Sequence, residues 1–201
     1  PHFAIDVQSL KCDFLLCSAY KFYGPHVGFL YSKPNLLDKI KTDNLIVQDQ
    51  SSPYRIETGT LNHAACNGVI KAIDFISSLG EGNSLRDKIE SSYLKISEHE
   101  NKLASNLYSS LNKLKNINVV GTDFSKSRAP TVSFIHKKKS ANEICKILAS
   151  HNICAWDGHF YALKAIQVLD LEKIGGITRL GVSIYNTEEE IRKTIKVLSN
   201  I

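Results

Sequence analysis

The middle of this chain carries a long run of helical periodicity between two segments of strand character. Large apolar residues recur at helical spacing over residues 85–114. Ser84 and Asp87 form an N-terminal capping pattern at the start of this run. A helix of this length bridges two domains in many folds. We therefore expect a domain boundary within the helices of residues 65–116.

The segment before the long helix alternates short apolar runs with polar loops. Residues 14–18 and 27–31 suit buried strands of an α/β sheet, and residues 3–7 read as a strand in progress. A short helix is expected over residues 36–40, since Pro34 is tolerated in a first turn. The polar stretch that follows predicts an irregular loop. A helix then runs to a stop at Gly80.

Strands and helices alternate again after the long helix. Apolar runs predict strands at residues 119–120, 131–135 and 178–183. Two capping boxes predict helices, formed by Ser140 with Glu143 and by Thr187 with Glu190. This order suggests a compact α/β sandwich that forms a domain of its own.

Composition narrows the classes of function. The chain has 201 residues, 43% hydrophobic and 22% charged, which is ordinary for a globular protein. Its net charge of +5 fits an anionic ligand such as phosphate or carboxylate as well as it fits nucleic acid. The five cysteines are odd in number and form no C-x-x-C pair, which argues against disulfides and a zinc site. We predict a cytoplasmic protein with no metal site.

We expect neither a membrane nor a nucleic acid as a partner. No apolar run approaches the ~20 residues that would span a membrane. The basic run at residues 136–139 lacks interleaved aromatic residues, so we interpret it as a solvated turn rather than a nucleic-acid patch.

The chain contains no methionine and starts at Pro1, from which we expect it to be a piece of a longer protein.

Lys21 follows an apolar run and precedes a Gly-Pro turn. A lysine held there and partly desolvated becomes available as a nucleophile, because desolvation disfavours the ammonium form. Such an amine can form a Schiff base with an aldehyde cofactor. The alternative is an ordinary exposed lysine, which composition alone would favour.

Three motifs occur in order along the chain. They are SAYKFYGP at residues 18–25, RIETGT at 55–60 and TRLGVSIYNT at 178–187. Together they resemble motifs of the class V aminotransferase family of pyridoxal-phosphate (PLP) enzymes, and within it the cysteine-desulfurase-like branch. The resemblance implies an α/β fold in which residues 1–65 end the PLP-dependent transferase large domain. Residues 66–201 would form bridging helices and a small C-terminal α/β sandwich domain.

The resemblance implies roles for four residues near the first two motifs. Lys21 matches the catalytic Schiff-base lysine. Ser18 and Thr60 match hydroxyl residues that bind the cofactor phosphate, Thr60 across a dimer interface. Tyr20 stands where the family usually has a histidine, and its phenol can still donate to phosphate. Ordinary turn chemistry is the alternative for Ser18 and Thr60.

Arg179 in the third motif resembles the arginine that grips the substrate carboxylate. A guanidinium fork binds a carboxylate through two parallel hydrogen bonds. An arginine inside an apolar strand is costly without such a partner, which favours a functional role over a structural ion pair.

The stretch WDGHFY at residues 156–161 departs from the family. Desulfurases carry Arg-x-Gly-x-x-Cys in this loop, but Trp156 and Tyr161 stand at the arginine and cysteine positions. A phenol cannot accept sulfur as a persulfide. Cys154 precedes the loop on an expected strand. His159 could contact the substrate as a proton-transfer residue, or be a plain loop histidine.

The resemblance implies a PLP-dependent transferase or lyase that acts on an amino acid as a homodimer. The family's N-terminal half, with the phosphate-binding turn and the aspartate that pairs with the pyridinium nitrogen, would precede Pro1 and is missing. The chain would then be the C-terminal portion of the enzyme. The alternative is a non-catalytic fragment or pseudoenzyme module that contributes fold and dimer contacts.

Overall fold

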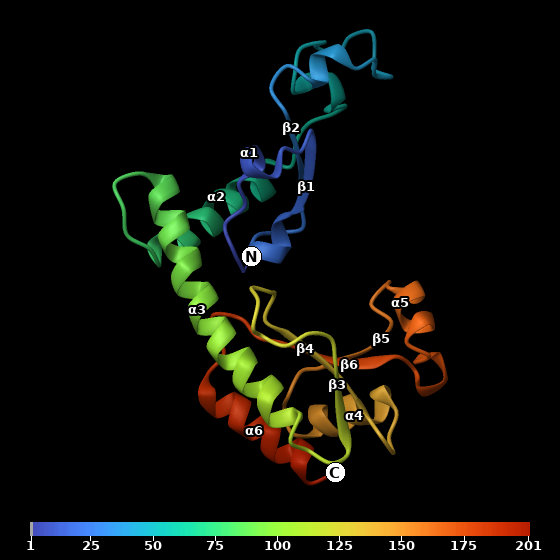
Figure 1. The fold of residues 1–201 in the computed structure, drawn as a ribbon. Helices are drawn as coiled ribbons and strands as arrows, with labels where there is room; N and C mark the ends of the chain where they lie inside the picture. The colour runs from blue at the N-terminus through green and yellow to red at the C-terminus, as the bar shows by residue number, and fades with distance from the viewer. Residues whose placement is uncertain (1) are drawn as a thin grey trace. The chain divides into compact units, whose positions relative to one another are not determined.

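The computed structural model describes residues 2–201. It divides into two compact units, each described here by itself (Figure 1). The N-terminal unit is Phe3–Lys95, and the C-terminal unit is Ile96–Ile201 together with His2. The long helix α3 (Leu85–Leu111) begins in the first unit and ends in the second. The predicted domain boundary between residues 65 and 66 stays a prediction.

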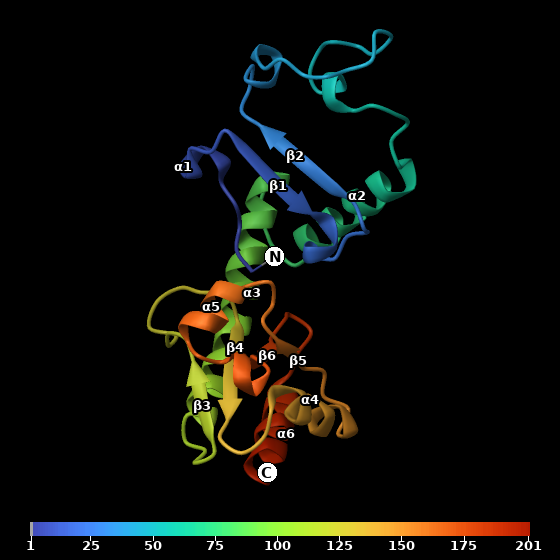
Figure 2. The same ribbon diagram turned by 90° about the vertical axis from the view of Figure 1, so that its right-hand side faces the viewer.

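The N-terminal unit is built on an antiparallel pair of strands. β1 (Phe14–Ser18) and β2 (Gly28–Ser32) pair in register from Phe14 opposite Ser32 to Ser18 opposite Gly28 (Figure 2). Around them lie the short helix α1 (Val7–Leu10), the long helix α2 (His63–Ser78) and three 3-10 turns. The turns are η1 (Ala19–Phe22), η2 (Leu37–Lys39) and η3 (Tyr54–Ile56).

Two expectations for this unit were wrong. Residues 3–7 are not a strand, because Asp6 caps α1 by accepting hydrogen bonds from the backbone N–H groups of Gln8 and Ser9. The strands β1 and β2 are also not buried within residues 2–201. Leu16 is 80% exposed and Phe29 44% exposed, since β1 and β2 pair with each other alone in the described chain.

Close backbone approaches fix the helices of the N-terminal unit. A Cβ on Gly68 of α2 would lie 3.0 Å from Cγ of Pro25, so this glycine lets the helix contact the Gly-Pro turn. A Cβ on Gly80 would lie 2.1 Å from the Lys88 carbonyl oxygen. Buried Ser92 of α3 donates to the Ile76 carbonyl of α2 at 2.6 Å. The predicted stop at Gly80 is therefore also the joint between α2 and α3.

The C-terminal unit is a four-stranded antiparallel sheet with helices. Its strands are β3 (Ile117–Val120), β4 (Thr131–His136), β5 (Trp156–Gly158) and β6 (Ile177–Gly181), in the order β3-β4-β6-β5 (Figure 2). The helices are α4 (Ala141–Ser150), α5 (Leu163–Val168) and α6 (Glu188–Ser199), with a 3-10 turn η4 (Glu172–Ile174). The predicted capping boxes of α4 and α6 are both confirmed.

Among the described residues of the C-terminal unit, one face of this sheet packs against helices and the other does not. Alternate residues of β4, such as Val132 and Phe134, are buried in a core shared with α3, α4 and α6. Their neighbours Thr131 and Ser133 point the other way and are only half-buried. The α/β sandwich expected for the end of the chain is thus confirmed. A strand was expected at Cys154, but the short strand β5 begins two residues later, at Trp156. Its position was missed because three residues are too few to show a period.

No helix within residues 2–201 has both the length and the apolar character needed to cross a membrane.

Candidate functional site

Lys21 sits on a turn whose backbone is fixed on both sides. Strand β1 ends at Ser18, and Lys21 follows in the last turn of η1. The N–H of Ala19 donates to the Val27 carbonyl at 2.9 Å, and the N–H of Gly24 donates back to the Ala19 carbonyl at 2.9 Å. Ala19 is fully buried. The sequence around Lys21 therefore forms a closed loop that holds its backbone in one place.

The glycine of the SAYKFYGP motif is required by this loop. A Cβ on Gly24 would lie 3.0 Å from both the Cβ and the carbonyl oxygen of Ala19. Tyr23 ends η1 in the left-handed region with φ 70°. The SAYKFYGP motif thus specifies a tight turn as well as a lysine. Its glycine is needed for the turn that holds Lys21.

The Lys21 side chain is exposed within residues 2–201. The partial desolvation expected from the sequence is therefore not provided by this part of the chain. Its Nζ lies 6.0 Å from the centroid of the Tyr20 ring, at the outer limit of a cation–π contact. The amine is reachable for a ligand that approaches the turn.

Within residues 2–201, the hydroxyls of Ser18 and Thr60 make no hydrogen bond. Ser18 is the residue before η1 but makes no side-chain capping bond, which is the bond ordinary turn chemistry would give it. Thr60 is exposed and lies just before Asn62, which caps α2 by accepting from Ala65 N–H. Within residues 2–201 no hydrogen bond or ion pair joins Thr60 to Lys21. The structure brings Ser18, Tyr20 and Lys21 onto one turn and leaves Thr60 on a separate loop.

His26 has no role among the predictions made from the sequence. Its ring stacks on Tyr20 with centroids 4.7 Å apart and planes at 22°. Tyr20 carries no charge where the family has a histidine, and His26 brings an imidazole next to it. The position of this histidine directly after the Gly-Pro turn is the sequence feature from which a role for His26 could have been predicted.

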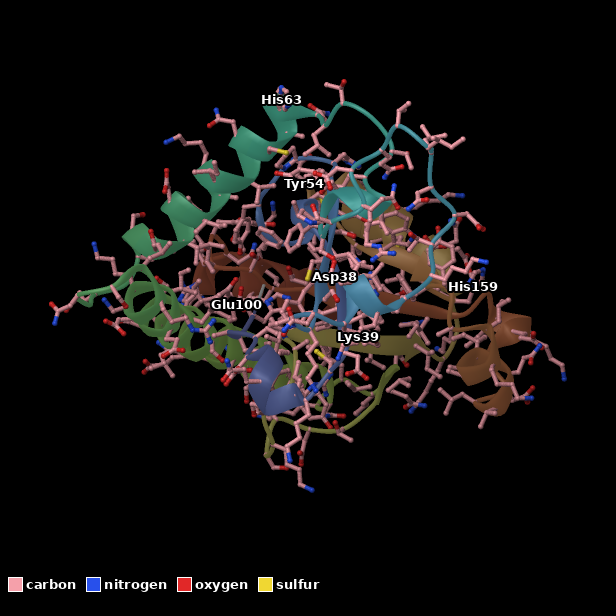
Figure 3. The ribbon with its side chains drawn as sticks, turned by 90° about the horizontal axis from the view of Figure 1, so that it is seen from above. Asp38, Lys39, Tyr54, His63, Glu100 and His159 are labelled. Atoms are coloured by element: carbon pink, nitrogen blue, oxygen red, sulfur yellow. The ribbon has the colours of Figure 1, made fainter. Side chains whose placement is uncertain are left out.

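Arg55 of the RIETGT motif has a structural role. It donates from Nη1 to the Asp38 carbonyl at 2.9 Å and from Nη2 to the Ile40 carbonyl at 3.0 Å. It thereby ties η3 to η2, the two turns that carry Tyr54 and Asp38 in Figure 3. Ser52 also donates to the Asp38 carboxylate, which lowers the pKa of that carboxyl. The first residue of the motif therefore shapes the loop before Thr60.

A groove of about 810 Å³ lies beside these turns in the N-terminal unit. It is lined by β2, by the turns around Leu37 and Pro53, and by α2. Neither Lys21 nor Thr60 lines it. We therefore place the candidate lysine site on the exposed η1 turn rather than in this groove.

Arg179 lies in the middle of β6 on the open face of the C-terminal sheet. It is directly opposite Ser133 of β4 on one side and Trp156 of β5 on the other, so these three side chains form a row on one face. Arg179 is exposed, and its Cζ lies 3.9 Å from the centroid of the Phe160 ring. The cost of burying this arginine, expected from the sequence, does not arise because its strand is covered on the opposite face only.

The loop after β5 carries His159, Phe160 and Tyr161. Figure 3 shows His159 on this loop. Its Nδ1 accepts a hydrogen bond from the Tyr161 N–H at 3.1 Å. Phe160 and Tyr161 both have left-handed backbones, with φ 52° and 61°, and Tyr161 is 99% exposed. Cys154 is exposed in the connection before β5, so its expected place on a strand was wrong.

The thiol of Cys145 in α4 has low reactivity as a nucleophile. Burial, together with the nearby Asp157 carboxylate, raises the pKa of its thiol to about 11. The thiol therefore stays protonated near neutral pH, and a protonated thiol is a poor nucleophile. Among residues 2–201, no group of acidic, histidine or cysteine side chains could hold a metal ion.

His136 in the basic run is a structural residue. It is buried, and its Nδ1 accepts from the backbone N–H groups of Lys138 and Lys139 at 3.1 Å each. These bonds fix the turn before α4. The run is therefore a turn anchored by His136, with Lys137 and Lys138 exposed as expected for a solvated turn.

These features define an α/β protein with an exposed lysine on a fixed turn and an exposed arginine on an open sheet face. The sequence model of the family described as aminotransferase class-V matches residues 1–194. The chain belongs to the class V aminotransferase family.

Curated relatives are cysteine desulfurases. That of Yersinia pestis (strain Pestoides F) is 27% identical over 213 residues, covering 100% of this chain and 48% of the relative. That of Yersinia pseudotuberculosis serotype O:3 (strain YPIII) gives the same values. The chain spans about half the length of the curated relatives that it matches.

Solved structures share the fold. The apo cysteine desulfurase from Thermococcus onnurineus NA1 has a TM-score of 0.80 at 24% identity, covering 99% of this chain and 49% of that one. The Escherichia coli cysteine desulfurase CsdA has a TM-score of 0.74 at 22% identity, covering 99% and 48%. A C-DES mutant with glycine covalently linked to its PLP cofactor has a TM-score of 0.73 at 17% identity, covering 100% and 49%. The predicted α/β fold class is confirmed.

Proposed function

We propose that this chain is part of a PLP-dependent transferase or lyase that acts on an amino acid. The observation that carries the proposal is the η1 turn, where an exposed Lys21 amine stands on a fixed backbone and the Ser18 hydroxyl, at the start of the same turn, makes no hydrogen bond within residues 2–201. Family membership and the PLP-bound relative of the same fold support it.

The residues of the turn fit the cofactor chemically. Lys21 would attach the cofactor aldehyde through Nζ. Ser18 has an unused donor for a phosphate oxygen, and Tyr20 has a phenol that can donate. His26, stacked on Tyr20, would add positive charge when protonated. Thr60 would donate to a phosphate from its own loop, in the homodimer across the interface between copies.

The substrate would be held and deprotonated by two side chains of this chain. Arg179 has a planar fork that can bind an α-carboxylate through two hydrogen bonds. Lys21, once its amine is free, would take a proton from the substrate α-carbon and return it as general base and acid. PLP, when bound, supplies an electron sink for that carbon.

The loop after β5 argues against one reaction. Tyr161 stands at the position of the family cysteine, and a phenol cannot accept sulfur as a persulfide. Cys154 lies before β5 and Cys145 has a raised thiol pKa. We therefore do not propose persulfide-forming cysteine desulfuration by a loop cysteine. Transamination, elimination and racemisation all fit the proposed roles, and His159 could transfer a proton in any of them.

The test is the visible absorbance of lysine-bound PLP. The full-length protein is mixed with PLP, and the band is compared in the wild type, Lys21→Ala and the control Lys33→Ala, an exposed lysine of the same unit. We expect the band in the wild type and the control, and its loss in Lys21→Ala. No band in the wild type would leave the alternative, a non-catalytic or pseudoenzyme module. Residues 1–201 alone are expected to bind PLP weakly.

A further inference from the structure

We propose that Phe160 is a positioning residue for Arg179, holding its guanidinium plane so that the edge of the fork faces a carboxylate. The inference deepens the proposed function and rests on its assignment of carboxylate binding to Arg179. It concerns the C-terminal unit alone.

The contact between these two residues is a short cation–π contact. Arg179 Cζ lies 3.9 Å from the Phe160 ring centroid, well inside the range of a cation–π contact. A guanidinium stacked by its face keeps its five N–H donors, which lie in its plane, available for other partners. Within residues 2–201 Arg179 makes no hydrogen bond or ion pair. Phe160 therefore orients the group without using the donors that a carboxylate needs.

The strands on both sides limit where a carboxylate can approach. Ser133 and Trp156 lie directly opposite Arg179 on its two neighbouring strands, with side chains on the same face. Trp156 is 70% exposed and belongs to the edge strand β5. Arg179 is thus flanked by a small hydroxyl and by a large indole, and its guanidinium lies over the Phe160 ring.

The backbone holds Phe160 in an unusual conformation. A Cβ on Gly176 would lie 2.3 Å from the Gly158 carbonyl oxygen, so the base of the loop is pinned by a close backbone approach. Phe160 follows with φ 52°, a region that non-glycine residues rarely adopt. Such backbones persist where the surroundings determine them, and they concentrate at binding sites. Here the consequence of the strained backbone is the position of the Phe160 ring against Arg179.

The structure also supplies a reporter for the test. Trp156 is the single tryptophan of the 201-residue chain, and it lies beside Arg179. Its emission in this chain therefore reports ligands that bind at Arg179. No cofactor is needed for the measurement.

The experiment titrates the 201-residue chain with L-alanine and with acetate while Trp156 emission is followed. We expect a saturable change in the wild type and its loss in Arg179→Gln. Phe160→Leu should weaken binding by about two- to fivefold, the value of an exposed cation–π contact. Phe160→Tyr, which keeps an aromatic face, should bind as the wild type does. In an Arg179→Lys background, which has no planar fork, Phe160→Leu should have no further effect.

The outcomes separate this inference from the proposed function. Binding unchanged by Arg179→Gln, or no saturable change in the wild type, would overturn the carboxylate role of Arg179 and the inference with it. Binding lost in Arg179→Gln but unchanged in Phe160→Leu would overturn the inference alone. Equal weakening in Phe160→Leu and Phe160→Tyr would also overturn it. Far-UV circular dichroism checks that each variant is folded, and the double variant gives an independent reading of the coupling.

Discussion

The two units differ in how far each completes its own hydrophobic core. In the C-terminal unit, Phe134, Leu148 and Leu198 are almost fully buried in one cluster that joins the sheet to three helices. In the N-terminal unit, apolar residues of β1 and β2 such as Leu16 and Phe29 remain exposed. The C-terminal unit therefore buries a core with the residues it has. The N-terminal unit presents apolar surface of the kind that marks an interaction site, in a chain that spans about half the length of its relatives.

The largest expected effect contrasts two apolar residues, one in each unit. Phe134→Ala should cost about 3–5 kcal/mol of unfolding free energy, because it leaves a cavity in a packed core. Leu16→Ala should change the free energy by less than about 0.5 kcal/mol, since that side chain is 80% exposed. Denaturant unfolding followed by Trp156 emission measures the C-terminal unit, and far-UV circular dichroism measures the whole chain.

A similar cost for both variants would contradict the contrast. It would mean that β1 is covered in solution, for example by a second copy of the chain. Repeating the measurement at several protein concentrations separates this case, because stability gained from association depends on concentration.

The next largest expected effect is a loss of unfolding free energy when the joint between α2 and α3 in the N-terminal unit is disturbed. Gly80→Ala would place a Cβ 2.1 Å from the Lys88 carbonyl oxygen, and backbone must move to relieve this. We expect a loss of about 1–3 kcal/mol, as for other overpacked positions. Gly59→Ala is the matched control, since a Cβ there has no atom within 4 Å. Circular dichroism during urea unfolding would show the difference, and equal stability of the two variants would rule out a tight joint.

Much of the fold could be predicted from local signals. The capping boxes at Ser140 and Thr187 are local hydrogen-bond patterns, and both helices begin where the sequence predicts. Residues 3–7 were misread because an apolar run of this length does not reveal that Asp6 caps the next turn. Burial of β1 was misjudged because it depends on partners that lie outside the local sequence.

The candidate site was predictable in its residues but not in its contacts. The motifs pointed to Lys21 and Arg179, and the structure places both on exposed surfaces of their own units. The stack of His26 on Tyr20 and the cation–π contact of Arg179 with Phe160 join residues that the motifs treat separately. Such ring contacts depend on loop backbone conformation, including the left-handed φ of Phe160, and a single sequence does not encode that in a readable pattern.

The smallest expected effect concerns the pH dependence of a capping box. Glu143 accepts a hydrogen bond from the Ser140 N–H at 2.8 Å, and this backbone bond, with the bond from the Ser140 hydroxyl, lowers the pKa of the carboxyl below its usual range. A lowered pKa in the folded state adds stability above the unfolded pKa of about 4.3, and this stability is lost as the pH falls through the folded pKa. Glu143→Gln should therefore destabilise the C-terminal unit slightly at neutral pH.

The difference between Glu143→Gln and the wild type should then shrink as the pH falls below about 4, where the unfolded carboxyl becomes protonated. Trp156 emission during denaturant unfolding at both pH values measures it. Glu98→Gln is the control, because Glu98 is exposed on α3 within the same unit, outside the capping boxes. A difference that stays constant with pH would show that Glu143 acts by helix propensity and not through its charge. The start of α4 would then be stabilised by packing and helix propensity, with no contribution from the Glu143 charge.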